Sequence, residues 1–321
     1  HPERQTVQAV MSRKVVSTVG EDEHIRVMLG RVGEKMIATP IQRGAGVITS
    51  LSRADGLAMI PRNSEGIDAD TPVNIELLRD PNAIDNKIMV TGSHDLTIDL
   101  ISSELGSNRP PITLSSSNVG SIGGLIALQR GEAHIAGVHL LDDKTGTYNL
   151  PFIHKYLPDT PIALVRLVER IQGLMVLKGN PKNISGLSDL SQSNISYINR
   201  QRGSGTRLLL DYQIKILGMS PDDIQGYDRE EYTHLGVAAA VSAGKVDTGL
   251  GILSAANAMG LQFIPVLSEQ YDLVVPIKYH KSSLIKPLYE LIQSSEFQAK
   301  VHALGGYDTD GMGKVTTLTG S

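Results

Sequence analysis

The chain has 321 residues, a net charge of −4, no cysteine and no tryptophan. Its length predicts more than one compact unit. The slightly acidic balance argues against a nucleic-acid or membrane-surface partner, which would require a basic face. The absence of cysteine excludes disulfides, thiol catalysis and cysteine-ligated metals. No apolar run reaches the length of a membrane span and no signal-peptide pattern is present, so we expect a cytoplasmic protein.

Residues 1–79 are rich in predicted strands and turns. Four segments have a strand pattern between turn residues: 24–32, 35–41, 56–61 and 72–78. Residues 44–55 fit a glycine turn followed by one short helix. We expect a small barrel or sandwich here, without a nucleophile–base pair or a cluster of metal ligands.

From about residue 85 the pattern changes to strands alternating with helices. The predicted strands cover 86–93, 112–117 and 133–141, the helices 94–105 and 121–131, and the alternation resumes between 194 and 253. This order predicts parallel sheets with helices on both faces.

Two extended segments connect the halves of this pattern. Residues 164–181 lead from the first half to the second, 261–277 return, and 283–307 are expected to form one long amphipathic helix and a stop. The order predicts two lobes with a ligand cleft between them. Lobe one is expected to comprise about 85–165 and 265–321, and lobe two about 170–260. Ligands of such sheets lie beyond the C-terminal ends of the strands.

Small polar residues at the predicted strand ends are the first candidates for ligand binding. Ser93 and His94 follow one strand, and Ser116 and Ser117 end the next. The three consecutive hydroxyls at 115–117 exceed what one helix cap needs. Weaker candidates are His139, Tyr232 and His234, because a lone histidine is more often structural than a ligand contact.

The segment INRQRGSGTRLLLDYQI at 198–214 is a donor-rich turn that opens an apolar helix. Its candidates for ligand binding are Arg202, Ser204, Gly205, Thr206 and Arg207. Glycine allows the backbone to approach a guest closely, and the first N–H groups of a helix attract anions. The alternative is a helix capped by Ser204 or Thr206 with its arginines in solvent. We expect this loop to bind an anion from lobe two.

No spacing in the sequence demands catalysis. Ser93 adjoins His94, but neighbours at a helix start point apart, and GSHDL is not the G-x-S-x-G nucleophile elbow. Phosphate-binding and dinucleotide fingerprints are missing, and the nine histidines lack paired spacing. We therefore expect no catalytic residue, no metal site and no covalently bound cofactor.

The N-terminal block resembles a known family. Residues 25–78, and most specifically GVITSLSRADGLAMIP at 46–61, resemble the C-terminal domain of molybdopterin molybdenumtransferase, the enzyme that inserts molybdate into molybdopterin, and the matching domain of gephyrin. The resemblance covers about residues 4–79. It implies a small β-barrel domain over residues 1–80.

The remainder resembles a second family. The motifs TGSHD, GEAHIAGVHLLD, NRQRGSGTRLLLD and EYTHLGVAAAVSAGKVDTGLGI make residues 85–314 similar to a periplasmic-binding-protein-like domain. Such domains follow the molybdenumtransferase in some archaea and bacteria, and they are similar to LysR effector domains and to oxyanion-binding proteins. The resemblance implies a two-lobed α/β domain of type II over residues 85–321.

Together the resemblances imply a function. The family's catalytic and metal-binding residues lie in domains that precede the barrel, so we expect the C-terminal, non-catalytic part of a longer molybdenum cofactor biosynthesis protein. Only with its N-terminal catalytic domains is it expected to be a molybdopterin molybdenumtransferase. Its cleft is expected to bind a small oxyanion, first molybdate or tungstate, for sensing or delivery.

Two alternatives remain open. The first alternative is that the chain completes an active assembly, with a homodimer as one arrangement, that binds molybdopterin or another organic ligand. The second is that it is the solute-binding component of a transporter.

Overall fold

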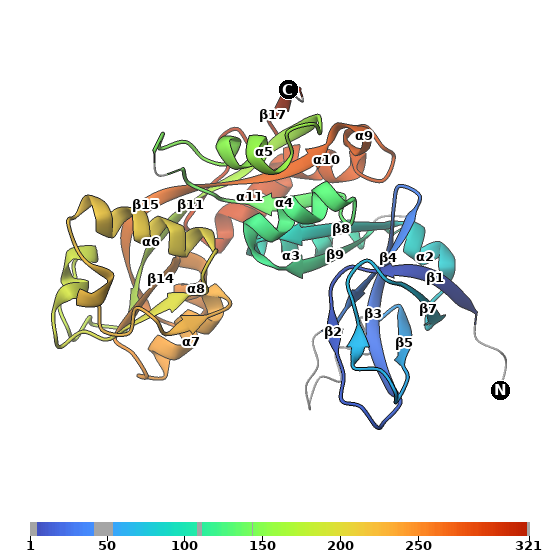
Figure 1. Ribbon diagram of the computed structural model, residues 1–321. Helices are drawn as coiled ribbons and strands as arrows, with labels where there is room; N and C mark the ends of the chain where they lie inside the picture. Colours follow the sequence, from blue (N-terminus) through green and yellow to red (C-terminus); the bar gives the residue numbers. More distant parts are fainter. Residues whose placement is uncertain (1–4, 42–53, 108–110, 143, 320–321) are drawn as a thin grey trace.

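The computed structural model describes residues 5–41, 54–107, 111–142 and 144–319. It contains a small β-barrel beside a two-lobed α/β unit, and the barrel lies next to the lobe that carries β8 and β9 (Figure 1). This is the predicted fold class.

The barrel is closed, with the strand order β1-β4-β3-β5-β7. Its strands are β1 (Thr6–Met11), β3 (Glu23–Val32), β4 (Lys35–Pro40), β5 (Gly56–Ile60) and β7 (Pro72–Leu77), and β2 (Val15–Val16) pairs with β6 (Gly66–Ile67). Alternate residues of these strands face inward and form the apolar core, as the period of two requires. All four predicted strands are confirmed, whereas most of the helix predicted over 44–55 lies outside the described residues.

One ten-stranded sheet runs through both lobes. Its main path has the order β13-β12-β14-β11-β15-β10-β8-β9, and β16 and β17 also pair with β11. The strands are β8 (Lys87–Gly92), β9 (Thr113–Asn118), β10 (Ile135–Val138), β11 (Ile162–Val176), β12 (Tyr197–Arg200), β13 (Glu230–Glu231), β14 (Thr248–Ile252), β15 (Gln262–Pro276), β16 (Tyr307–Asp308) and β17 (Val315–Leu318).

Helices cover both faces of the sheet in each lobe, as predicted. The prediction of parallel sheets is wrong in part, because β11 pairs antiparallel with β14 and β15 and so joins both lobes in one mixed sheet. Those of the first lobe are α3 (Leu96–Leu105), α4 (Gly120–Arg130), α5 (Leu150–Tyr156), α9 (Ile277–His280), α10 (Lys286–Gln293) and α11 (Ser295–Leu304). Those of the second lobe are α6 (Gly205–Ile216), α7 (His234–Ser242) and α8 (Leu253–Ala258), with the 3-10 turns η1 (Leu187–Ser191) and η2 (Pro221–Asp223). The helix α2 (Pro81–Asp85) connects the barrel to β8.

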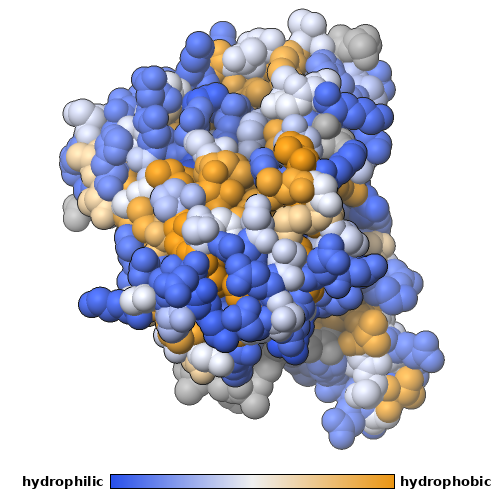
Figure 2. All heavy atoms as spheres, turned by 90° about the vertical axis from the view of Figure 1, so that its left-hand side faces the viewer, coloured by the Kyte–Doolittle hydropathy of each residue, from blue (hydrophilic) through white to orange (hydrophobic). Residues whose placement is uncertain are grey.

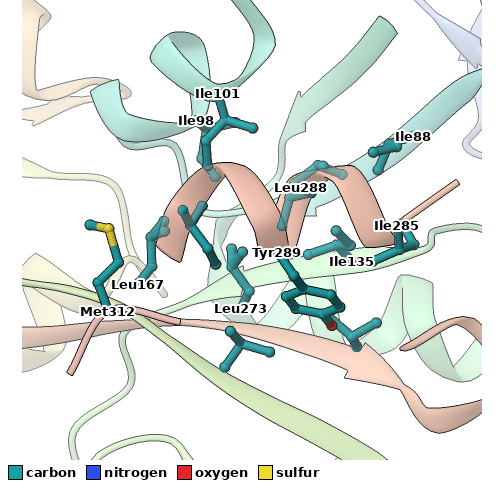
Figure 3. Packing of buried hydrophobic residues seen from close by; sticks show 14 of the residues in the cluster. Ile88, Ile98, Ile101, Ile135, Leu167, Leu273, Ile285, Leu288, Tyr289 and Met312 are labelled. Atoms are coloured by element: carbon teal, nitrogen blue, oxygen red, sulfur yellow. The ribbon is translucent and has the colours of Figure 1, made fainter. Parts of the chain in front are cut away.

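The core of lobe one lies between the sheet and the pair α3 and α10. Figure 3 shows Leu288 and Tyr289 of α10 facing Ile135 and Leu273 of the sheet. These side chains are almost completely buried, and each buried apolar side chain of this size contributes about 1.5–3 kcal/mol. The packing therefore holds the strand ends of lobe one in a fixed position.

The prediction of one uninterrupted helix over 283–307 is wrong. The structure divides this segment into α10 and α11 at Ser294. The hydroxyl of Ser294 accepts a hydrogen bond from the backbone N–H of Phe297, so the residue caps a new helix where the apolar period suggested an uninterrupted one. The break allows Leu288 and Phe297 to bury their side chains in one core.

The long strands β11 and β15 form the hinge between the lobes. They pair antiparallel over almost their full length, with register shifts between Arg166 and Val168 and between Gln172 and Gly173. A bulge bends a strand and increases its twist. The segment 168–172 between the two shifts is therefore where the sheet turns from lobe one into lobe two.

The barrel packs directly on lobe one. Met89 of β8 lies against Gly30 of β3, where an added Cβ would come within 2.3 Å of the Met89 sulfur. Lys87 forms a buried ion pair with Asp55. The contact is therefore both apolar and charged.

Figure 2 shows the lobe-two end of the molecule, with a band of apolar surface between hydrophilic side chains. Within the described part of the chain, no helix is both long and apolar enough to cross a membrane.

Candidate functional site

A buried cross-strand ion pair lies at the centre of the hinge. Arg170 of β11 and Glu269 of β15 are register partners, and Arg170 Nε donates to Glu269 Oε2 over 2.8 Å. A second carboxylate, that of Asp95, accepts from Arg170 Nη1. All three side chains are inaccessible to solvent. Because buried charges persist only when paired, the three side chains of this triad depend on one another.

Two strand ends of lobe one connect to this triad. His139 follows β10, and its Nδ1 forms a short hydrogen bond with Glu269 Oε1. Its Nε2 lies 2.7 Å from Oγ of Ser93, which follows β8. The His139 ring also stacks on Tyr271 at a centroid distance of 5.8 Å. A continuous chain of hydrogen bonds therefore runs from Glu269 through His139 to the half-buried Ser93 hydroxyl.

Lobe two supplies a second buried arginine and a second buried histidine. Arg200 ends β12, and its Nε and Nη2 donate to the backbone carbonyls of Glu231 and Tyr232. His234 begins α7, whose N-cap is Thr233. Arg200 and His234 are only 5% and 7% exposed, so contacts within the protein hold both side chains in place.

Helix N-termini from both lobes come together here. The first residue of α6, Gly205, packs so closely on His139 that an added Cβ would lie 2.1 Å from Nδ1. The start of α4 approaches the loop before α6, because a Cβ on Gly120 would be 3.8 Å from the Gly203 carbonyl oxygen. The α4 N-cap residue, Val119, makes no side-chain cap hydrogen bond. Free N–H groups at helix starts favour an anion.

Several buried polar atoms of the hinge lack partners among the described residues. They are both ring nitrogens of His234, Nη2 of Arg170 and Oε1 of Gln172. A buried polar atom left without a hydrogen bond costs about 1–3 kcal/mol. Such atoms in a native fold call for an explanation, and a polar ligand supplies one.

The electrostatics of the cluster are balanced. Burial, and then the nearby Arg170 charge, lowers the pKa of Arg200 to about 10. Burial lowers the pKa of His139, and it lowers that of His234 further with help from Arg200 and Arg170, so both rings are neutral at pH 7. Burial alone would raise the pKa of Glu269, but His139 and Arg170 lower it to about 2. The cluster thus contains two arginines and two carboxylates, so an anion bound here would depend on hydrogen bonds from individual N–H groups, including those of the arginines.

The structure distributes the predicted residues of lobe one over three places. Ser93 and the weaker candidate His139 lie together in the hinge. His94 is half-exposed, and its Nε2 lies 3.0 Å from Asp99. Ser116 pairs with Val90 within the sheet, while Ser117 lines a cavity of about 140 Å³ between the barrel and α4. Successive residues of a strand face opposite sides, so the three hydroxyls at 115–117 do not form one group.

The predicted loop of lobe two divides in the same way. Gly205 and Thr206 reach the hinge, where Thr206 Oγ1 lies 3.4 Å from Nε2 of Gln172, and Ser204 is the N-cap of α6. Arg207 is buried under the Tyr227 ring and donates to Asp211. Arg202 is 78% exposed and pairs with Asp228 and Glu230. Both arginines therefore have acidic partners within lobe two.

The two remaining candidates lie at the start of α7. Tyr232 is 69% exposed and His234 is buried, although only one residue separates them. His234 therefore belongs to the hinge cluster, whereas Tyr232 contributes its carbonyl oxygen to Arg200.

Sequence reasoning missed the charged residues of the hinge. Arg170 and Glu269 lie within the segments that were interpreted only as connections, and Arg200 lies in the segment 198–214 but was not among its candidates. The available signal was the presence of charged residues within extended segments rich in apolar residues, since a buried charge is almost always paired or functional. Asp95 was not among the candidates either, although it caps α3 and also pairs with Arg170.

Comparison with known families is consistent with this architecture. The model of the PBP superfamily domain, for periplasmic binding proteins, matches residues 102–293. The chain belongs to the PBP superfamily. The model of the MoeA C-terminal region, domain IV, matches residues 8–78, so the barrel is a MoeA-type domain. The protein YvgK of Bacillus subtilis is 40% identical over 232 residues, which are 72% of this chain and 74% of YvgK.

Solved structures with the same fold include oxyanion-binding proteins. The substrate-binding protein of a phosphate transporter from Clostridium perfringens, with bound phosphate, has a TM-score of 0.52 at 14% identity and covers 68% of this chain and 97% of its own. The structure titled as the tungstate ABC transporter from Geobacter sulfurreducens has a TM-score of 0.51 at 15% identity and covers 68% and 98%. These similarities establish the fold of the two-lobed unit.

Proposed function

We propose that this protein binds a small oxyanion at the hinge between its two lobes and thereby senses or delivers that anion for molybdenum cofactor biosynthesis. The observation that carries the proposal is the set of buried nitrogens of His234 and Arg170, at the meeting point of the two lobes, that have no hydrogen-bond partner in the described part of the chain. The N-terminal ends of α4, α6 and α7 add further N–H groups.

The relatives and the barrel suggest which anions to test. Proteins with the same fold are named for phosphate, tungstate and sulfate. The MoeA-type barrel makes molybdate and tungstate candidates, because the family it resembles uses molybdate. This support comes from the neighbouring domain and from proteins of the same fold, and the fold alone does not determine the ligand.

Calorimetric titration with molybdate, tungstate, sulfate and phosphate at matched ionic strength tests the proposal. At least one anion should bind, and Arg200→Ala should weaken it by about tenfold or more, since a charge-assisted hydrogen bond contributes ~1.5–3 kcal/mol. Arg229→Ala, which removes an exposed arginine of the same lobe, is the matched control and should bind like the wild type.

A different result would favour a second candidate. If none of the four anions produces heat, the hinge does not bind a free oxyanion. The MoeA-type barrel would then support the alternative that the chain completes a molybdopterin-binding assembly, and the same titration would be repeated with that pterin.

A further inference from the structure

We infer that lobe one carries a second ligand site, in a cavity over β11 and β15, and that this site binds a small zwitterion of the α-amino acid class. The cavity has a volume of about 300 Å³. The inference is carried by a buried carboxylate oxygen in its lining, Oδ1 of Asp272, which has no hydrogen-bond partner among the residues that the structure describes. It goes beyond the function proposed above and does not depend on it.

The cavity is separate from the hinge cluster. Asp272 follows Tyr271 on β15, and successive residues of a strand face opposite sides of the sheet. The hydroxyl of Tyr271 donates to the backbone carbonyl of Ser93 at the hinge, whereas Asp272 is the register partner of Arg166. The residues of the hinge triad do not line this cavity. A ligand here would therefore occupy a different place from an anion at the hinge.

Two amide side chains donate to Asp272, and their orientation is fixed by their other partners. Oδ1 of Asn149 accepts from the backbone N–H of Leu140, so its Nδ2 donates to Oδ2 of Asp272 over 2.8 Å. Oε1 of Gln270 accepts from Nη2 of Arg166, so its Nε2 donates to the same Oδ2 over 2.5 Å. Oδ2 is therefore satisfied, and Oδ1 is the oxygen left for a ligand.

A buried carboxylate with one free oxygen favours a ligand that donates hydrogen bonds. Asp272 is 0% exposed, so bulk water does not supply the missing donor. Burial raises the pKa of Asp272, and the hydrogen bonds from Asn149 and Gln270 lower it. A further donor on Oδ1 would favour the ionised form in the same way. An ammonium group suits this position because it also brings the opposite charge.

The rest of the lining suits a carboxylate at the other end of the ligand. Two cations, Arg166 and Lys314, and two acids, Asp272 and Asp310, line the cavity and leave it without net charge. Arg166 already donates to Glu169, whereas Lys314 is exposed and is the cation available to a ligand. A molecule with one ammonium and one carboxylate group matches this lining, and a volume of this size suits a small ligand.

Calorimetric titration of the full chain with the standard L-amino acids, each added separately, tests the inference. At least one should bind. Its N-acetyl derivative lacks the ammonium group and its amide lacks the carboxylate, so each should bind about tenfold or more weakly for the loss of one charge-assisted hydrogen bond. Absence of binding by every amino acid, or equal binding of the three forms, would overturn the inference.

Asp272→Asn changes the free position from acceptor to donor. Its amide oxygen must take the place of Oδ2, because Asn149 and Gln270 both donate there, so its NH₂ group occupies the place of Oδ1. The ammonium group of the ligand would then meet a donor, and the affinity for the amino acid should fall by at least about tenfold. Asp159→Asn, at an exposed position after α5, is the matched control and should bind like the wild type.

Two further variants locate the ligand. Lys314→Gln should weaken the amino acid by about tenfold and leave its amide within about twofold, because both changes remove the same contact. A general loss of folding would weaken both forms together. Arg200→Ala, at the hinge, should leave amino acid binding unchanged. If Arg200→Ala abolishes that binding, or if Asp272→Asn retains it, the ligand lies at the hinge and the inference is wrong.

Discussion

Two buried histidines lie at opposite ends of one short strand and serve different parts of the molecule. His134 precedes β10 and faces the barrel, whereas His139 follows β10 and faces the hinge. The Nδ1 of His134 accepts from the backbone N–H of Met89, and the ring also bonds to the backbone of Arg31. His139 instead bonds to two side chains, Ser93 and Glu269.

The difference shows how partners decide the role of a buried group. Backbone partners are fixed by the fold, so His134 connects lobe one to β3 of the barrel and has little freedom to change. Side-chain partners can exchange protons and reorient when a ligand arrives. Of the two ends of β10, the hinge is therefore the one suited to binding.

The largest expected effect comes from breaking the hinge cluster. Arg170→Ala leaves Asp95 and Glu269 buried without their cation, so it should lower the free energy of unfolding by about 3–5 kcal/mol. Urea denaturation measures this change. Arg62→Ala removes an exposed ion pair on the barrel and should cost at most about 1 kcal/mol. Equal effects of the two changes would show that the hinge cluster does not hold the lobes together.

The barrel end of β10 should respond to acid. Burial lowers the pKa of His134 to about 4, below its unfolded value of 6.5. Between these values the unfolded chain binds the extra proton, so stability falls as the pH drops from about 6.5 to 4. The loss should approach about 3 kcal/mol, since one pKa unit corresponds to about 1.4 kcal/mol.

Comparison of variants isolates this contribution from those of His139 and His234. The oxygen of His134→Asn can accept from Met89 but does not titrate, so this variant should lose less stability than the wild type over the same pH interval in urea denaturation. His154→Asn, at an exposed site on α5, should retain the wild-type profile. Parallel profiles for all three proteins would contradict the prediction.

The alternation of strands and helices made the fold predictable. The period of two in the barrel and the apolar helix faces in the lobes specify elements from local sequence, and the order of the two connecting segments specifies the hinge. Ser93 could be placed at a strand end for the same reason. Local sequence does not show which surroundings a strand residue faces. It also does not show which residue of another strand lies beside it in the sheet.

The hinge residues illustrate this limit. Arg170 and Glu269 are 99 positions apart and meet only because β11 and β15 pair in one register. Arg202 and Arg207 looked suitable because they flank a glycine-rich turn, but their acidic partners come from the segment 211–230. Donor spacing along a chain therefore identifies a loop without showing which of its donors reach a cleft.

The smallest expected effect concerns the exposed arginine of that loop. Arg202→Ala removes only solvent-exposed ion pairs, so the free energy of unfolding should change by less than about 0.5 kcal/mol and the affinity for the bound anion by less than about twofold. Calorimetric titration of Arg202→Ala and Arg200→Ala with the same anion compares the contributions of the two arginines to its affinity. A tenfold loss from Arg202→Ala would mean that the loop turns into the cleft when the anion binds, since the guanidinium would then have to leave Asp228 and Glu230. The anion-binding role predicted for this loop from the sequence would in that case hold for the bound state.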